Sequence, residues 1–172
     1  MVFDTGLFLE CVRNLSQARR QPSPRKPCKC SAPQFDRYLA RISGPLLERI
    51  DIHVEVPAVP ISALRDLQPG TGSGTIRRQV ERALAVQRAR FGHGSTTANG
   101  SMKTRQLRKF CTIDTAGERI LRQAVSELGL SARAHDKVLR VARTIADLAG
   151  EPNITATHLP EAIQYRRLDR NL

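Results

Sequence analysis

The sequence has no tryptophan, and aromatic residues make up only 4% of its 172 positions. A core without large aromatic side chains uses small aliphatic ones, which is typical of helical bundles rich in Ala, Leu and Val. Only Cys28 and Cys30 lie close together among four cysteines, which does not fit a secreted disulfide framework. No apolar run approaches the roughly 20 residues that span a bilayer, and the first residues lack the basic start of a signal peptide. We therefore expect a mostly α protein of the reducing cytoplasm with no membrane partner.

Several patterns that carry catalysis are also missing. No Gly-x-x-x-x-Gly-Lys-Ser/Thr phosphate loop occurs, and the run PGTGSG at residues 69–74 has no lysine after it, which indicates a hinge. Asp51, His53 and Glu55 alternate along one short stretch, a pattern more typical of the wet side of a strand than of a metal or acid–base cluster. The other candidate histidines have no matching acidic or cysteine partners and are interpreted as surface or bundle residues: His93, His135 and His158.

The formal net charge of +12 comes mainly from arginines spread along the chain. Such an excess favours association with a polyanion such as nucleic acid, with an affinity that falls as salt rises. Ordinary solvated faces encoded by a GC-rich genome would show the same excess. The charge alone therefore leaves nucleic-acid contact open.

Hydrophobic spacing predicts a bundle of helices from Thr75 onward. The expected helices cover Thr75–Phe91, Met102–Phe110, Thr115–Leu128, a segment between Ser131 and Gly150, and a last segment after Thr155 or Thr157. The first helix carries Ile76, Val80, Leu84 and Gln87 along one side. Asp114 or Thr115 and then Ser131 are suitable N-caps, and Gly129 and Gly150 suit the left-handed residue that ends a helix. The fourth helix has an apolar stripe that leaves four basic residues outside it: Arg133, Lys137, Arg140 and Arg143.

The stretch from Arg41 to Pro57 changes its hydrophobic period. Its first half has helical spacing, whereas its second half alternates apolar residues at Ile50, Ile52, Val54 and Val56, so a helix is expected to run into a strand. Glu48, Arg49 and Asp51 lie at the junction, where side chains leave the core. Arg49 either faces a neighbour or ligand, or forms an ion pair with Glu48 or Asp51.

Two segments resemble one known family. SGPLLERIDIHVEVP, residues 43–57, is similar to the segment after sensor 1 in magnesium-chelatase-like AAA+ ATPases (subunit ChlI-like), most closely the ComM/YifB competence type. LSARAHDKVLRVARTIADLAG, residues 130–150, followed by EAIQYRRLDR, resembles the sensor 2 helix and last helix of the same family's lid. The resemblance covers about Pro27 to Arg170 and stops before that. It implies a divergent or disordered N-terminal segment with a Pro/Arg-rich loop at 1–33, the C-terminal remnant of an AAA+ α/β core at 34–68, and a helical lid at 75–172.

The resemblance also implies roles for two arginines. Arg49 corresponds to the arginine finger, which acts in trans on a neighbouring subunit's nucleotide. Arg133 corresponds to the sensor 2 arginine, which contacts the γ-phosphate and couples hydrolysis to lid movement. A structural ion pair for Arg49 and an ordinary exposed position for Arg133 are the alternatives. Cys28 and Cys30 match half of a four-cysteine knuckle, so no complete metal site is expected.

The family's motors form hexameric rings that use ATP and Mg²⁺ and act on branched DNA during natural transformation. The 172-residue sequence contains no Walker A or Walker B motif, so it resembles a truncated C-terminal part of such a motor. By itself this part is expected to bind no cofactor and to hydrolyse no ATP. The alternative function is a non-enzymatic basic helical module that binds DNA or a partner.

Overall fold

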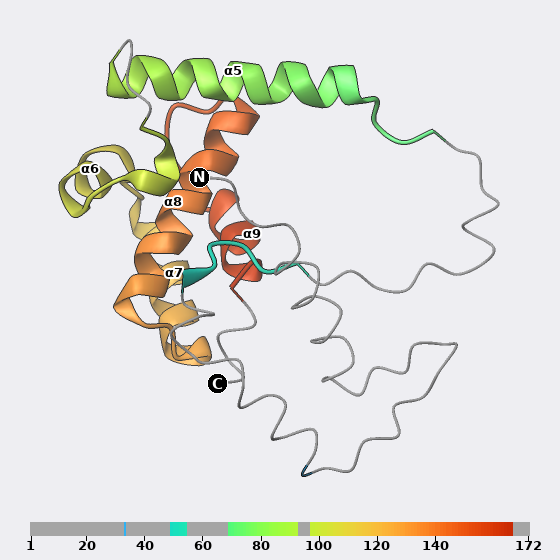
Figure 1. Ribbon diagram of the computed structural model, residues 1–172. Coiled ribbons are helices and arrows are strands. Elements are labelled where there is room, and N and C mark those ends of the chain that lie inside the picture. Colours follow the sequence, from blue (N-terminus) through green and yellow to red (C-terminus); the bar gives the residue numbers. More distant parts are fainter. Residues whose placement is uncertain (1–32, 34–48, 55–68, 93–96, 167–172) are drawn as a thin grey trace. The chain divides into compact units, whose positions relative to one another are not determined.

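The computed structural model describes Pro33 and residues 49–54, 69–92 and 97–166. Figure 1 draws these residues as coloured ribbon. Apart from Pro33, all of them belong to one structural unit, which comprises residues 44–55 and 67–172. Arg49 is helical, but the rest of the helix predicted before it lies outside the described residues. The N-terminal segment, Cys28, Cys30, Glu55 and His93 lie outside them as well.

Five α-helices and one short 3₁₀ helix make up the described bundle, and the predicted helices after residue 70 are all confirmed. Their bounds are α5 Ser73–Phe91, η1 Asn99–Ser101, α6 Thr104–Phe110, α7 Thr115–Leu128, α8 Ala132–Ala149 and α9 His158–Gln164. Within the described ranges, no helix is both long and apolar enough to cross a membrane.

The ends of α7 and α8 follow from local chemistry. Asp114 Oδ1 accepts a hydrogen bond from the Gly117 N–H at 2.7 Å, and Ser131 Oγ accepts one from the Ala134 N–H at 3.2 Å. Each side chain satisfies a backbone donor that has no partner within its helix. Gly129 and Gly150 end the two helices with φ angles of 62° and 79°, in the left-handed region that glycine adopts without strain. These predicted caps are confirmed.

The start of α9 differs from the prediction. Thr157 occupies the N-cap position, but its side chain makes no capping hydrogen bond. Instead His158 Nδ1 accepts from the Thr155 N–H at 3.0 Å. The imidazole, which is buried, thus holds the turn that leads into the helix.

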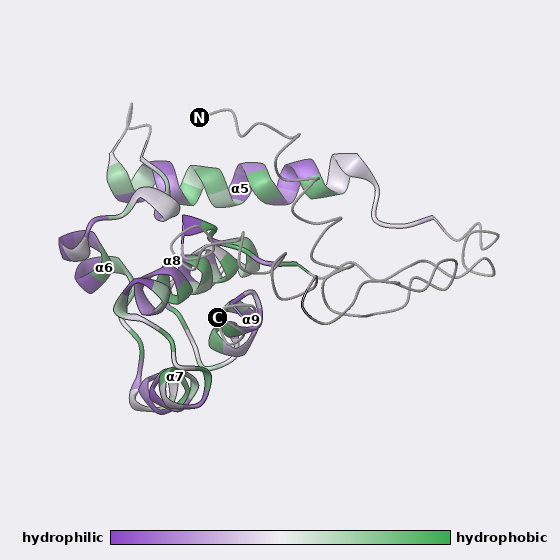
Figure 2. Ribbon diagram, turned by 60° about the horizontal axis from the view of Figure 1, so that its bottom comes forward, coloured by the Kyte–Doolittle hydropathy of each residue, from purple (hydrophilic) through white to green (hydrophobic). Residues whose placement is uncertain are grey.

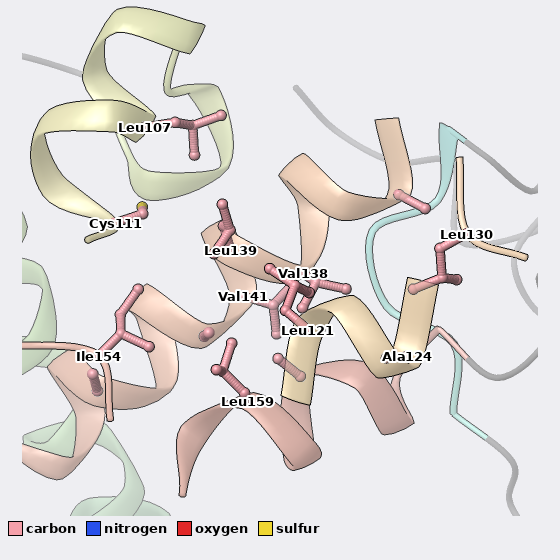
Figure 3. Close-up of a cluster of buried hydrophobic side chains, with 14 of the residues drawn as sticks. Leu107, Cys111, Leu121, Ala124, Leu130, Val138, Leu139, Val141, Ile154 and Leu159 are labelled. Carbon is pink, nitrogen blue, oxygen red and sulfur yellow. The ribbon is translucent and has the colours of Figure 1, made fainter. Parts of the chain in front are cut away.

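Helix α8 is the centre of the core. It contacts α5, η1, α6 and α9, while α7 packs against α9. Val138, Ala142 and Ala146 on α8 are fully buried, as is Leu159 on α9. The core is built from small and medium aliphatic side chains, as the scarcity of aromatics indicates (Figure 3).

The apolar side of α5 is largely exposed, and one expectation about α8 is wrong. Ile76, Val80 and Leu84 on α5 are 48%, 44% and 38% exposed, because α5 contacts the bundle through Ala83, Gln87 and its C-terminal end. Arg143 on α8 was expected outside the core stripe but is only 2% exposed. A hydrophobic period therefore identified these helices correctly without identifying which side is covered.

The strand predicted over residues 50–56 is absent from its described part. Residues 50–54 form no strand, and Asp51 lies in a bend. Ile52 and Val54 are 45% and 56% exposed whereas His53 is buried, the reverse of the predicted faces. A strand needs a second strand to satisfy its backbone groups, and the described part of the chain contains none.

Candidate functional site

Three contacts attach the segment 49–54 to the bundle, although it is remote from α8 and α9 in sequence. Asp51 Oδ1 lies 2.7 Å from Lys137 Nζ on α8. The Ile50 carbonyl accepts a hydrogen bond from Arg166 Nη1, and the His53 N–H donates to the Tyr165 carbonyl at 2.9 Å. The segment that carries Arg49 is therefore positioned by α8 and by the end of α9.

Arg49 is exposed and makes no ion pair or hydrogen bond with any other described residue. The alternative of a pair with Asp51 is not observed, because Asp51 contacts Lys137 instead. The second alternative partner, Glu48, lies outside the described residues. An exposed guanidinium on an anchored segment presents five N–H donors in a planar fork, which suits a phosphate or carboxylate ligand.

Arg133 is exposed in the first turn of α8. The first N–H groups of a helix and its dipole make this end favourable to an anion, and the cap by Ser131 fixes the local backbone. His135 and Asp136 follow, with the ring Nδ1 3.3 Å from Asp136 Oδ1. The site thus has a cationic side chain beside a helix N-terminus.

The Asp51–Lys137 ion pair brings the two predicted arginines into one framework. Arg49 is two residues before Asp51, and Arg133 is one helical turn before Lys137. A shift of α8 relative to the segment 49–54 would therefore change the distance between Arg49 and Arg133. The structure does not bring Asp51 and His53 into a metal site, and among the described residues no group of His, Cys, Asp and Glu could hold a metal ion.

A buried polar network fixes α8 against α5 and η1. Asp147 on α8 has a fully buried side chain that accepts hydrogen bonds from Arg90 at 2.7 and 2.5 Å, from Asn99 at 2.7 Å and from Arg143 at 3.1 Å. Arg143 also donates to the carbonyls of Glu151 and Pro152 at 2.7 and 2.9 Å. Burial raises the pKa of Asp147, but the hydrogen bonds from Arg90 and Asn99 and the two arginine charges outweigh it and hold the pKa below its usual value.

Sequence reasoning missed this network. The spacing of Arg143 and Asp147, four residues apart on one helix, is a pattern that could have indicated a pair. Nothing in the sequence connects them with Arg90 or Asn99, because those contacts span 57 and 48 residues. The network matters for the site because it sets the position of the helix that carries Arg133 and Lys137.

A groove of about 690 Å³ lies between α6, α7 and α8. Its apolar lining includes Leu107, Leu121 and Leu139, and its charged lining includes Arg108, Glu118 and Asp136. Cys111 also lines it, and burial raises the pKa of this thiol to about 11, even though the charges of Arg143, Arg90 and Arg140 lower it. The thiol is therefore protonated at neutral pH and is a poor nucleophile.

Comparison with known proteins identifies the family. The family model described as magnesium chelatase, subunit ChlI C-terminal, matches residues 70–166, which include the whole described bundle from α5 to α9. The chain belongs to the magnesium chelatase ChlI family. A second model, magnesium chelatase, subunit ChlI, matches residues 1–64. The family match therefore reaches residue 1, further than the resemblance, which was expected to stop near Pro27.

Several curated relatives are similar to this ChlI-family chain. It is 37% identical over 145 residues to the competence protein ComM of Haemophilus influenzae and, over the same length, to the YifB protein of Escherichia coli. A Mycobacterium tuberculosis protein is 33% identical over 148 residues. The aligned regions cover 84% to 85% of this chain but only 28% to 29% of each relative. The chain thus spans less than a third of the length of these relatives.

Proposed function

We propose that this chain forms the C-terminal part of a ring-shaped AAA+ ATPase in which Arg49 acts on the nucleotide of a neighbouring subunit. The observation that carries the proposal is that Arg49 is exposed and unpaired among the described residues, on a segment fastened to α8 through Asp51 and Lys137. A finger needs both properties, because its guanidinium must reach a neighbour and must do so from a fixed position. Family membership supports the same assignment.

The second part of the proposal concerns Arg133. In the intact protein, Arg133 contacts the terminal phosphate of ATP bound in its own subunit, aided by the N-terminus of α8. The described residues supply cationic groups for phosphate and no carboxylate cluster for Mg²⁺. ATP with Mg²⁺ supplies the phosphoryl group. Arg49 offsets the negative charge that develops while the phosphoryl group is transferred to water. Arg133 couples contact with the terminal phosphate to movement of the helical lid.

Partners and location follow from the same proposal. Like subunits assemble into a closed ring, because a finger that acts in trans requires a neighbour at every site. Six subunits and a place in the cytoplasm are what the family resemblance implies. The work of the ring is on DNA, which agrees with the net charge of +12 and with the similarity to a competence protein.

Subunit mixing tests the trans-acting role. Residues 34–172 are joined to the preceding region of the Haemophilus influenzae relative, and two variants are made: Arg49→Ala, and one whose Walker A lysine is replaced. Each variant alone is expected to lose at least about 100-fold in ATP hydrolysis, since fingers contribute about 10³ to 10⁵ in rate. An equal mixture restores hydrolysis at about a quarter of the sites, where an intact Walker A meets an intact Arg49.

The control is Arg119→Ala, which removes an exposed arginine from α7 and is expected to leave hydrolysis unchanged. Normal hydrolysis by the Arg49→Ala ring would refute the trans-acting role and leave Arg49 with a structural role only. The same applies if mixed rings, verified by native mass spectrometry, show no recovery. Hydrolysis that is independent of both arginines, together with retained DNA binding, would favour the non-enzymatic binding module.

A further inference from the structure

One stretch of the chain has no acidic residue. Between Glu81 and Asp114 the sequence contains no Asp or Glu, although the average over the whole chain, 16 in 172, would place about three there. The same stretch carries seven basic residues: Arg82, Arg88, Arg90, Lys103, Arg105, Arg108 and Lys109. It includes the C-terminal half of α5, all of η1 and all of α6.

The fold brings the two basic helices of this stretch together. Phe91 at the end of α5 and Phe110 at the end of α6 pack edge to face, with ring centroids 5.7 Å apart. Arg88 lies one turn before Phe91, and Lys109 precedes Phe110, with its ammonium 5.1 Å from the centre of that ring. Figures 1 and 2 both show α6 next to the C-terminal end of α5, and α6 is largely hydrophilic in Figure 2.

Most of these cations have no acidic partner. Arg90 is the exception, because buried Asp147 binds it at 2.5 Å, and Arg108 lines the same groove as Glu118 and Asp136. The remaining five are exposed and form no ion pair among the described residues: Arg82, Arg88, Lys103, Arg105 and Lys109. Arg105 and Lys109 are four residues apart and so share one face of α6. The nearby carboxylate of Asp147 is fully buried and paired with two arginines, so it does not cancel this charge.

We propose that Arg88, Lys103, Arg105 and Lys109, the α5–α6 basic surface, bind the phosphate backbone of duplex DNA without reading its sequence. Exposed Arg and Lys without acidic partners can neutralise phosphates, and the released counterions drive the binding. A duplex is favoured over a single strand because Phe91 and Phe110 are partly buried and packed on each other. They are therefore not available as platforms on which unpaired bases stack.

The inference deepens the proposed function by locating the DNA contact on the lid, and it concerns binding without nucleotide. The test uses the full 172-residue chain, a fluorescent 25-base-pair duplex and anisotropy titrations between about 50 and 200 mM salt, the range over which phosphate contacts dominate affinity. A triple variant, Arg88→Gln, Arg105→Gln and Lys109→Gln, neutralises the surface. The matched control, Arg77→Gln, Arg119→Gln and Arg122→Gln, removes the same charge from exposed positions in the N-terminal half of α5 and on α7.

The surface variant is expected to bind about 30-fold or more weaker at the lowest salt, with the salt slope reduced by about three, one for each lost contact. The control variant is expected to bind within about threefold of the wild type, because only long-range attraction is lost. Circular dichroism checks that both variants keep their helices. A 25-nucleotide single strand is expected to bind more weakly than the duplex.

Equal losses in the two variants would show that only net charge matters and would overturn the assignment. Unchanged binding by the surface variant would do the same, as would preference for one sequence or for the single strand. A further outcome is that the wild-type chain does not bind DNA but self-associates, and that the surface variant abolishes this self-association. This result would overturn the proposal and identify a second copy of the chain as the partner of the surface. None of these outcomes depends on ATP hydrolysis, so they are distinct from failure of the Arg49 proposal.

Discussion

Lys137 Nζ on α8 lies 2.7 Å from Asp51 Oδ1, and this contact joins two parts of the chain that are more than 80 residues apart. The Lys137 side chain is 12% exposed and that of Asp51 is 57% exposed. A pair that is open to water on one side contributes little to stability, on the order of 1 kcal/mol or less. Its importance is positional, because Arg49 is two residues from Asp51 and Arg133 is one turn from Lys137.

Replacement of the acidic partner is expected to loosen the segment without unfolding the bundle. In Asp51→Asn the N–H of His53, which donates to the Tyr165 carbonyl at 2.9 Å, should exchange its hydrogen faster than in the wild type. The free energy of unfolding should fall by no more than about 1 kcal/mol. Hydrogen exchange followed by mass spectrometry and urea denaturation give the two values.

The control for this prediction is Glu118→Gln. It removes an exposed carboxylate 3.9 Å from Arg122 on α7 and should leave exchange at residues 50–54 unchanged. If Asp51→Asn exchanges like the wild type throughout that segment, the hydrogen bonds to Arg166 and Tyr165 alone hold it and the ion pair has no positioning role.

Asp147 is expected to make stability depend on pH in the acid range. Its pKa is depressed in the folded state, whereas the unfolded chain has an ordinary value of about 3.9, so the unfolded state binds the proton more readily. The stabilisation is therefore complete above the unfolded pKa and is lost as pH falls through the lower folded pKa. Asp147→Asn should lower the free energy of unfolding by about 3 kcal/mol or more, since Arg143 then stays buried without its counter-charge.

The difference between wild type and Asp147→Asn isolates this carboxylate from the other acids of the chain. Urea denaturation at several pH values between about 2 and 6 measures it, a range that brackets the ordinary pKa. The gap should be constant in the upper part of the range and shrink towards the lower end. A gap that widens on acidification would mean that Asp147 is protonated more readily in the fold than in the unfolded chain.

Gly117 is expected to resist replacement, although alanine usually stabilises a helix. A methyl group there would lie 2.9 Å from Leu159 Cδ1 on α9 and 3.1 Å from Asp114 Oδ1, the atom that caps α7. The strain, about 1 to 3 kcal/mol, should exceed the gain of up to about 1 kcal/mol in helix propensity. Gly74→Ala on α5 is the control, because its nearest neighbour is Arg78 Nη1 at 3.7 Å, and it should be neutral or stabilising. Thermal denaturation compares them, and equal effects would refute close packing of α7 on α9.

The helices of the bundle were predictable because their start and stop signals are local. Asp114 and Ser131 cap α7 and α8 through residues three positions away, and Gly129 and Gly150 end them by backbone conformation alone. The buried side of each helix was less predictable, as Arg143 shows. Its guanidinium reaches the core only because Asp147 and the carbonyls after α8 satisfy it, and that arrangement exists only in the tertiary structure.

The candidate site was also predictable only in part. Arg49 and Arg133 were identified from segments that resemble a family, and their surroundings could not be inferred from spacing. Asp51 and His53 were assigned to the polar face of a strand. In the structure Asp51 lies in a bend and forms an ion pair with Lys137, and His53 is buried. A strand pattern describes which residues alternate, whereas the presence of a strand depends on a pairing partner elsewhere in the fold.

The last prediction separates the roles of Arg133 and Arg49 by what each does to nucleotide affinity. It uses the joined protein described above and a fluorescent nucleotide in equilibrium titrations. Arg133→Ala should weaken binding of ATP by about 10-fold or more, the value of a charged hydrogen bond, and weaken ADP much less, because the lost contact is to the terminal phosphate. Arg49→Ala should leave both affinities nearly unchanged while hydrolysis falls, since a finger interacts mainly with charge that develops in the transition state. Arg119→Ala serves as the control for loss of an exposed arginine. Equal weakening of ATP and ADP by Arg133→Ala would place its contact away from the terminal phosphate, and no weakening of either would leave Arg133 as an ordinary residue of the first turn of α8.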